Sequence, residues 1–317
     1  MGPMRIRVRV PATTANLGPG FDGMGLALGL YNEIEAEPAS ALEVMIEGEG
    51  ADLLPRDATN RVVRAAAALF ERMGSALPPM RLRCHNRIPL MSGLGSSAAA
   101  VVGGLALAQA WMGRFDPPEA LLEMATMLEG HPDNVAPALL GGLVLVARDE
   151  EGLITARVPI PPMRVALALP GVAVSTEMAR RLLPSHLTLG DVVYQIGHAA
   201  LLVHAFREGD WGLLGRAMRD RLHEPYRSQL IPGYERAVAA ARAAGAAAVC
   251  ISGSGPALAA FAPEGHEAIA AAMAAAFEEA GVSARTWVVE VDFEGVRVEI
   301  EPEASSIDPR RDPHGDF

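Results

Sequence analysis

The 317-residue sequence contains no lysine, so arginine supplies every positive side-chain charge apart from histidine. Three classes of lysine-dependent chemistry are therefore excluded. A Walker A phosphate loop, the phosphate contact of protein kinases and the Schiff base of pyridoxal phosphate enzymes each need a lysine. We expect any catalytic cation of this chain to be an arginine, a metal ion or the N-terminal end of a helix.

The sequence also has only two cysteines, no long apolar run and no net positive charge. Cys84 and Cys250 lie in apolar, strand-like stretches, which favours buried free thiols in a reducing compartment. No apolar run reaches the roughly 18 residues of a membrane span, and the first residues show no apolar signal-peptide segment, so we expect a cytoplasmic protein without membrane contacts. The net charge of −11 argues against a nucleic-acid partner.

The length of the chain and its hydrophobic content of 50% allow two domains with sizeable cores. Prolines cluster at residues 158–162 and mark a boundary between them. We therefore expect an N-terminal domain over residues 1–160, a C-terminal domain over residues 161–300 and a flexible, solvated tail over residues 301–317.

The strongest functional signal lies between Ile88 and Met112. Alternating residues before this stretch predict a strand, and apolar residues at helical spacing from Ala98 onward predict a helix. Between them, the Ser92–Ser97 segment holds glycines that let backbone N–H groups converge in front of the helix N-terminus. Such a turn can bind a nucleotide phosphate. The alternative is a tight glycine turn with Ser96 as the cap of the helix.

Periodicity predicts the other elements. Strands are expected at residues 6–10, 31–37, 42–47, 80–87, 143–147, 164–169, 247–251, just before 261, at 285–291 and at 296–300. Helices are expected at residues 61–73, 116–129, 176–183, 191–207, 210–222, 234–244 and 267–280. The first two strands after residue 30 should pair, and Pro11–Asp22 should be a loop outside the core. Asn60 and Asp116 are the expected caps of the helices that follow them, and Pro132 should end the second of these near Glu129.

The context of the glycine turn disfavours two other enzyme classes. Gly93–Ala98 satisfies the G-x-G-x-x-A pattern of dinucleotide-binding enzymes, but Asp116–Glu119 then begins another helix instead of the second strand of a Rossmann unit. An NAD-dependent oxidoreductase is therefore a weak alternative. A serine hydrolase is weaker still, because the sequence has no G-x-S-x-G turn.

Oxygen donors near the turn suit a hard cation better than zinc. His131 and Asp133 alone are a weak signal for a zinc site. Ser97 opens the predicted phosphate-binding helix, and Glu129 ends the next helix. One carboxylate, one hydroxyl and phosphate oxygens form a normal Mg²⁺ site. The alternative for Glu129 is a solvated helix end.

Four motifs occur in an order that resembles the GHMP kinases over nearly the whole chain, from Met4 to about Ile300. They are Pro11–Asp22, Gly93–Ala98, His131–Pro137 and Ser252–Pro256. The glycine-serine motif resembles the superfamily as a whole. The segments Ala15–Asp22 and Asp133–Pro137 are similar to the homoserine kinases rather than to the mevalonate or galactose enzymes.

This resemblance implies an α+β GHMP kinase fold with two domains. The first would be an ATP-binding, ribosomal-protein-S5-domain-2-like domain with a left-handed β-α-β unit, and the second a ferredoxin-like α/β sandwich, with the active site between them. The implied activity is the ATP- and Mg²⁺-dependent phosphorylation of the side-chain hydroxyl of L-homoserine to O-phospho-L-homoserine in threonine biosynthesis. A homodimer is implied as well. The alternatives are another small-alcohol kinase, such as a mevalonate-like enzyme, and a non-catalytic nucleotide-binding protein of the same fold.

The resemblance also implies contacts residue by residue. The ATP phosphates would contact Pro89, Leu90, Met91, Ser92, Gly93, Leu94, Gly95, Ser96, Ser97, Ala98 and Ala99. Mg²⁺ would contact Ser97 and Glu129. Homoserine would contact Asn16, Asp22, His131, Asn134, Thr176, Arg180, Arg227, Gly253, Ser254 and Gly255. Among these, the two arginines would bind the carboxylate of homoserine and the aspartate its ammonium group, whereas an isolated side chain of this kind would be an ordinary surface charge.

The implied catalytic residues are Asn134, Arg180 and Asp133. Asn134 stands where other GHMP kinases carry a catalytic aspartate. The resemblance therefore implies that the substrate hydroxyl passes its proton to the γ-phosphate without a protein base. Asp133 is the adjacent carboxylate, and the sequence leaves open which way it points.

Overall fold

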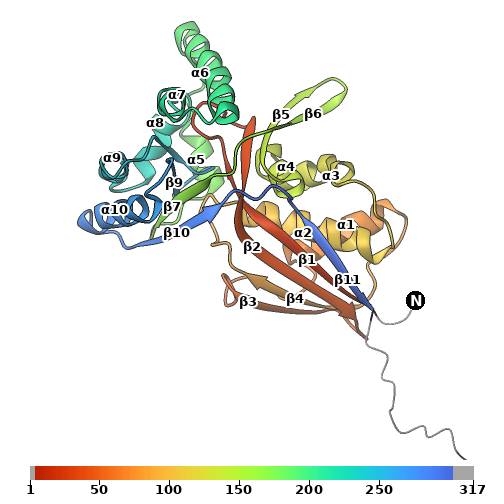
Figure 1. Ribbon diagram of the computed structural model, residues 1–317. Coiled ribbons are helices and arrows are strands. Elements are labelled where there is room, and N and C mark those ends of the chain that lie inside the picture. The colour runs from red at the N-terminus through yellow and green to blue at the C-terminus, as the bar shows by residue number, and fades with distance from the viewer. Residues whose placement is uncertain (1–3, 303–317) are drawn as a thin grey trace, which may run out of the picture.

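Two β-sheets with helices packed against them organise residues 4–302, the part of the chain that this computed structural model describes (Figure 1). The first sheet contains β1 (Met4–Ala15), β2 (Met24–Pro38), β3 (Glu43–Gly48), β4 (Met80–Asn86), β5 (Leu143–Asp149), β6 (Gly152–Val158) and β11 (Arg297–Pro302). Its strands run in the order β11-β1-β2-β4-β3, and β5 pairs with both β2 and β6. β3 and β4 pair in parallel, and the other pairs are antiparallel.

The helices of the first half pack against this sheet. They are α1 (Arg61–Arg72), α2 (Ser96–Trp111), the short 3-10 helix η1 (Pro118–Leu121), α3 (Leu122–Glu129) and α4 (Pro132–Leu140). α2 consists mainly of alanine, valine, glycine and leucine, and it packs against α1, α4 and β1. A helix that is apolar on all sides is buried. The surrounding core therefore holds the N-terminus of α2 in a fixed position.

The second sheet is antiparallel, with the strand order β10-β7-β9-β8. Its strands are β7 (Arg164–Pro170), β8 (Ala248–Ile251), β9 (Leu258–Phe261) and β10 (Ala284–Glu290). The accompanying helices are α5 (Thr176–Arg181), α6 (Leu189–Glu208), α7 (Trp211–Ala217), α8 (Glu224–Arg227), the 3-10 helix η2 (Ser228–Leu230), α9 (Tyr234–Ala243) and α10 (His266–Glu279). Leu258 belongs to the core beneath α9 and α10, whereas Phe261 packs edge-on against Phe206 of α6. Both faces of this sheet are therefore covered.

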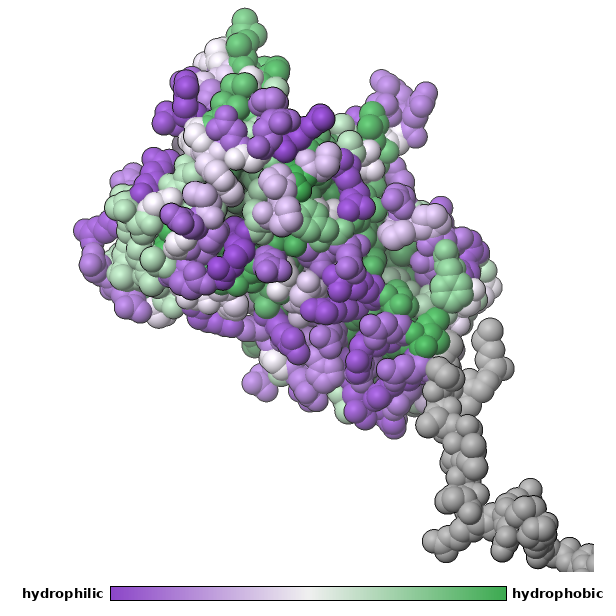
Figure 2. All heavy atoms as spheres, viewed as in Figure 1, coloured by the Kyte–Doolittle hydropathy of each residue, from purple (hydrophilic) through white to green (hydrophobic). Residues whose placement is uncertain are grey.

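The long helix α6 projects from the second half, and apolar surface gathers at this end of the molecule (Figure 2). Leu189, Val193 and Ile196 of this helix are exposed. None of the helices between residues 4 and 302 is long and apolar enough to cross a membrane.

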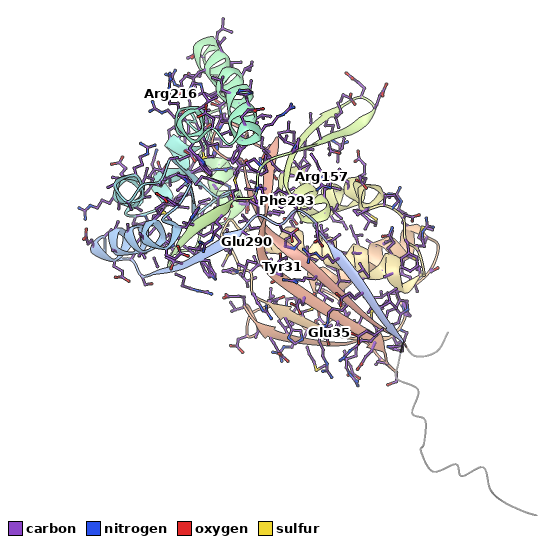
Figure 3. The ribbon with its side chains drawn as sticks, in the orientation of Figure 1. Tyr31, Glu35, Arg157, Arg216, Glu290 and Phe293 are labelled. Carbon is purple, nitrogen blue, oxygen red and sulfur yellow. The ribbon has the colours of Figure 1, made fainter. Side chains whose placement is uncertain are left out.

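The two sheets meet where β10 lies beside β2, and Figure 3 labels Tyr31 and Glu290 at this junction. The Tyr31 hydroxyl donates a hydrogen bond to Oδ2 of Asp292 at 2.8 Å. The chain then returns to the first sheet, because β11 pairs with β1. The domain boundary near residue 160 stays a prediction, although residues 297–302 complete the first sheet. Residues 303–317 of the expected tail lie outside the described residues.

One local prediction is wrong because polar residues are buried where a surface loop was expected. β1 continues through Pro11 to Ala15, and Thr13 and Asn16 are buried. The backbone N–H of Thr13 donates to the carbonyl of Leu94 at 3.1 Å. This segment runs between the two halves of the molecule, so its polar groups find protein partners instead of water.

Two further predictions are wrong. The strands at residues 31–37 and 42–47 do not pair with each other, because β4 lies between β2 and β3. Asp116 is not a helix cap: its carboxylate accepts a hydrogen bond from Nε of Arg114 at 2.8 Å, and Pro117 occupies the N-cap position of η1. The predicted break after Glu129 is confirmed, but α4 begins again at once with Pro132 in its first turn, where a proline is well tolerated.

Candidate active site

A cavity of about 580 Å³ lies between the two halves and collects side chains from both. It contains every predicted homoserine contact except Gly255, which lies directly behind Gly93. Of the predicted phosphate contacts, the cavity wall contains Met91, Ser92, Gly93, Gly95, Ser96 and Ser97. Leu94, Ala98 and Ala99 are fully buried behind this wall, and Pro89 and Leu90 precede it. The structure thus brings most of the predicted site residues together.

The glycine turn leaves the N-terminus of α2 open to the cavity. Gly93 and Gly95 have φ angles of 80° and 72°, a region that favours glycine. Gly95 is the N-cap of α2, and no side chain accepts a hydrogen bond at this cap. The alternative in which Ser96 caps the helix is therefore wrong. Because the first N–H groups of a helix have no partner within it, this end can bind an anion.

Ser97 and Glu129 meet beside this helix end. Oγ of Ser97 donates a hydrogen bond to Oε2 of Glu129 at 2.6 Å, although 32 residues separate them. The Arg61 guanidinium, which the sequence did not single out, donates to the same carboxylate oxygen at 2.8 Å and also contacts Oγ of Ser97. A hydroxyl and a carboxylate that already share a cation are a chemically suitable donor pair for Mg²⁺.

Asp22 and Arg180 form a bidentate ion pair at the other end of the cavity, with N–O distances of 2.8 and 2.9 Å. The loop after β1 positions the aspartate. Asn16 has a φ of 70°. Its Oδ1 accepts from the Asp22 N–H at 3.0 Å, and its Nδ2 donates to the Gly253 carbonyl at 2.7 Å. One asparagine therefore joins this loop to the loop after β8.

Arg227 lies in the same region and is 2% exposed. Its Nη1 donates to the Gly253 carbonyl at 2.9 Å. Among the described residues no carboxylate forms an ion pair with Arg227, and its Nε has no partner. Burial and the neighbouring charge of Arg180 lower the pKa of Arg227. A buried guanidinium without a carboxylate is costly, and a carboxylate ligand would relieve this cost.

His223 supports Arg227 from behind. Its Nε2 lies 2.8 Å from the Gly18 carbonyl and therefore carries the proton. Burial lowers the pKa of His223, so the ring is neutral near pH 7 and Nδ1 faces Nη1 of Arg227 at 3.5 Å. His223 could not be predicted from the sequence, because its role depends on a contact with a loop about 200 residues earlier in the chain.

The turn between α3 and α4 answers the question of where Asp133 points. Its Oδ1 lies 2.6 Å from Nδ1 of His131. Burial lowers the pKa of His131, but the contact with Asp133 and the charge of Glu129 outweigh burial and raise it. Asn134 connects this pair to β1, because its Oδ1 accepts from Oγ1 of Thr13 at 2.7 Å and its Nδ2 donates to Oδ1 of Asp133 at 3.4 Å. The Asp133 carboxylate thus points toward His131 and raises the pKa of that histidine.

Comparisons with known proteins show which family the chain resembles. The family model described as "GHMP kinases N terminal domain" matches residues 60–142, and "GHMP kinases C terminal" matches residues 202–279. A homoserine kinase of Moorella thermoacetica is 50% identical over 276 residues, which cover 87% of this chain and 93% of the relative. A homoserine kinase of Carboxydothermus hydrogenoformans is 45% identical, with 87% and 91% covered. The crystal structure of homoserine kinase from Cytophaga hutchinsonii superposes with a TM-score of 0.83 at 34% identity, covering 93% of this chain and 97% of that one.

Proposed function

The chain belongs to the homoserine kinases of the GHMP kinase superfamily, and we propose that its cavity holds Mg²⁺ and the ATP phosphates at the α2 end and L-homoserine at the Arg227 end. The predicted fold class is confirmed. The chain is a kinase that phosphorylates the alcohol group of homoserine, which gives O-phospho-L-homoserine for threonine biosynthesis. The observation that carries the proposal is that one cavity contains an open helix N-terminus and, at its other end, Arg180 and Arg227.

At the α2 end, the N–H groups of the first helical turn bind the phosphates of ATP. Ser97 and Glu129 hold Mg²⁺, which supplies positive charge at the transferred phosphoryl group when it is bound. This combination replaces the lysine that the chain lacks. Gly93 and Gly95 line the cavity and have no side chains, so the phosphates can approach the backbone closely.

At the other end, Arg227 and Arg180 bind the carboxylate of homoserine. Arginine suits this role because its planar group presents two parallel donors to a carboxylate. Asp22 then exchanges part of its contact with Arg180 for the ammonium group of the substrate. The pre-formed ion pair thus supplies both charges that a zwitterion needs, and Thr176 and Ser254 complete the wall beside it.

Phosphoryl transfer mainly requires positioning and charge neutralisation. The hydroxyl oxygen of homoserine forms a bond to the γ-phosphorus, the bond to the bridging oxygen of ADP breaks, and the hydroxyl proton passes to the transferred phosphoryl group. The amide of Asn134 cannot accept this proton. The carboxylate of Asp133 lies 2.6 Å from Nδ1 of His131, so in this proposal the transferred phosphoryl group and not Asp133 takes the proton.

A coupled assay of ADP release over homoserine, mevalonate, galactose and shikimate tests this function. We expect turnover that depends on Mg²⁺ and a clear preference for homoserine. A preference for another alcohol would overturn the substrate and leave the kinase activity standing. ATP binding without turnover on any alcohol would instead indicate a non-catalytic nucleotide-binding protein. The cytoplasmic location and the homodimer remain predictions. Light scattering of the purified protein tests the homodimer.

A further inference from the structure

Arg61 occupies the place where a metal ion would be needed. It is the first residue of α1, and its side chain is 50% exposed, whereas the side chain of Glu129 is only 7% exposed. One guanidinium nitrogen, Nη1, contacts both Oε2 of Glu129 and Oγ of Ser97. The same two oxygens are the proposed ligands of Mg²⁺, and Arg61 also lines the cavity.

Two cations cannot use these oxygens in the same way. Mg²⁺ binds oxygen at about 2.0–2.1 Å and demands a nearly regular octahedron. The guanidinium nitrogen, at 2.8 Å from Oε2 of Glu129, stands within the space that the ion and its other ligands require. A buried carboxylate without any counter-charge is costly. Glu129 therefore needs Arg61 before the metal arrives and must release it afterwards.

We propose that Arg61 is a built-in cation of the Mg²⁺ site, which neutralises Glu129 while the site lacks a metal ion and turns away from Ser97 and Glu129 toward solvent when Mg²⁺ binds with ATP. The long, half-exposed side chain can make this move because α1 begins at the rim of the cavity. While the metal ion is absent, the same guanidinium can also bind phosphate oxygens of ATP, because arginine binds phosphate bidentately. The proposal rests on the proposed binding of ATP and Mg²⁺ at this end.

The proposal predicts thermodynamic coupling between Arg61 and Mg²⁺. Without metal, Arg61 bridges Glu129 and the phosphates, so removing it leaves a carboxylate facing a polyanion. With metal, the bridge no longer depends on Arg61, so removing it has a small effect. Coupling of this kind is reciprocal for binding free energies. The gain in ATP affinity upon addition of Mg²⁺ should consequently be larger in a variant without Arg61.

Calorimetry of ATP binding, once in EDTA and once in excess Mg²⁺, measures this coupling directly. Arg61→Met should weaken the binding of metal-free ATP by about ten- to a hundredfold, the range for one hydrogen bond to a charged group. It should weaken the binding of ATP in Mg²⁺ by less than about threefold. Arg64→Met, which removes an exposed arginine one turn further along α1, is the matched control and should leave both affinities unchanged.

Arg61→Lys separates charge from packing, because it should recover most of the metal-free affinity. If Arg61→Met loses the same ATP affinity in EDTA and in Mg²⁺, or loses none under either condition, the proposal is overturned. The proposed function stays intact in that case, provided that the wild-type protein binds ATP. If the wild-type protein binds ATP under neither condition, the proposed function itself is overturned and this role of Arg61 with it.

Discussion

The two ends of the cavity both pair a carboxylate with an arginine, but they do so in opposite ways. At the α2 end the carboxylate of Glu129 is buried and its partner Arg61 is half exposed. At the homoserine end Asp22 and Arg180 are equally exposed, at 37% each, and the buried member is a second arginine, Arg227. In the proposed assignment, the nucleotide end therefore holds a fixed anion with an exchangeable cation, whereas the substrate end holds a fixed cation.

This asymmetry follows from what each end has to bind. A phosphate chain arrives together with a metal ion, so a fixed carboxylate that can change its counter-ion is useful there. An amino acid arrives with its own carboxylate, and a fixed guanidinium without a partner then gains the most from binding. Substitutions at one end of the cavity should therefore weaken binding there and leave binding at the other end unchanged.

The largest effect is expected for Gly95→Val. A side chain at this position would meet Oγ1 of Thr13 and approach Oδ1 of Asn134, and the φ of 72° is strained for valine. The turn would therefore be displaced, and ATP affinity should fall by more than about a hundredfold, or about 2.7 kcal/mol. Calorimetry measures this. Gly74→Val is the matched control, because Gly74 has a similar φ of 75° but open space around it. A folded Gly95→Val protein with normal ATP affinity would contradict the role of the turn.

The second effect concerns the substrate end. Arg227→Ala and Arg180→Ala should each raise the homoserine KM by about ten- to a hundredfold, the range for one lost hydrogen bond to a charged group. The KM for ATP should stay nearly constant. We expect the larger effect for Arg227, because removing Arg180 also frees Asp22 for the ammonium group.

Steady-state kinetics with varied homoserine checks this prediction, with thermal unfolding as a test that the Arg227 variant is folded. Arg181→Ala, on the same helix as Arg180 but bound only at the surface to Glu177, is the control. Wild-type KM values in both main variants would mean that homoserine binds elsewhere.

The third effect is smaller and separates turnover from binding. Ser97→Ala removes the hydroxyl that bonds to Glu129 at 2.6 Å but keeps the backbone N–H at the helix end. We expect kcat to fall by about tenfold, which corresponds to about 1.4 kcal/mol of transition-state stabilisation, with a smaller change in ATP affinity. Ser97→Thr keeps the hydroxyl and should restore most of the rate. An affinity loss that equals the rate loss would argue against a metal ligand.

The smallest effect on activity is expected for Glu224→Gln, which changes the pH dependence of stability. Burial raises the pKa of Glu224 to about 8, and its Oε1 accepts from the Ile251 N–H at 2.7 Å. The unfolded chain loses this proton at about pH 4.3. The stabilising effect of the protonated side chain is therefore complete below that pH and decreases as the pH rises toward 8, by up to about 1.4 kcal/mol per unit.

The glutamine variant cannot lose a proton, so its stability relative to the wild type should increase between about pH 5 and 8. Urea unfolding at several pH values tests this. Parallel pH curves for the two proteins would show that Glu224 does not titrate in this range.

The nucleotide end was the more predictable of the two from sequence, because its signals are local. A strand, a glycine turn and an apolar helix follow one another within 33 residues, from Met80 to Met112, and each has its own periodicity. Arg61 could not be predicted in this way. It is an exposed residue of another helix, and its contacts with Ser97 and Glu129 span 36 and 68 residues.

The substrate end was predicted mainly through the resemblance, since its residues come from segments far apart in the sequence. The composition of Pro11–Asp22 suggested a solvated loop, but Asn16 pairs with the Gly253 carbonyl across the two halves. Burial of such polar groups depends on tertiary contacts, which periodicity does not describe. β6 was missed for a related reason, because none of its residues is fully buried and its strand form depends on pairing with β5.

In the proposed function, the two ends of the cavity serve one reaction, in which the γ-phosphoryl group of ATP is transferred to the hydroxyl of homoserine. Phosphorus NMR of a mixture of the protein, ATP, Mg²⁺ and L-homoserine tests it most directly. We expect ADP and a single phosphomonoester in equal amounts, with no phosphomonoester when homoserine is omitted. ADP accompanied only by inorganic phosphate would contradict it, because the protein would then transfer the phosphoryl group to water.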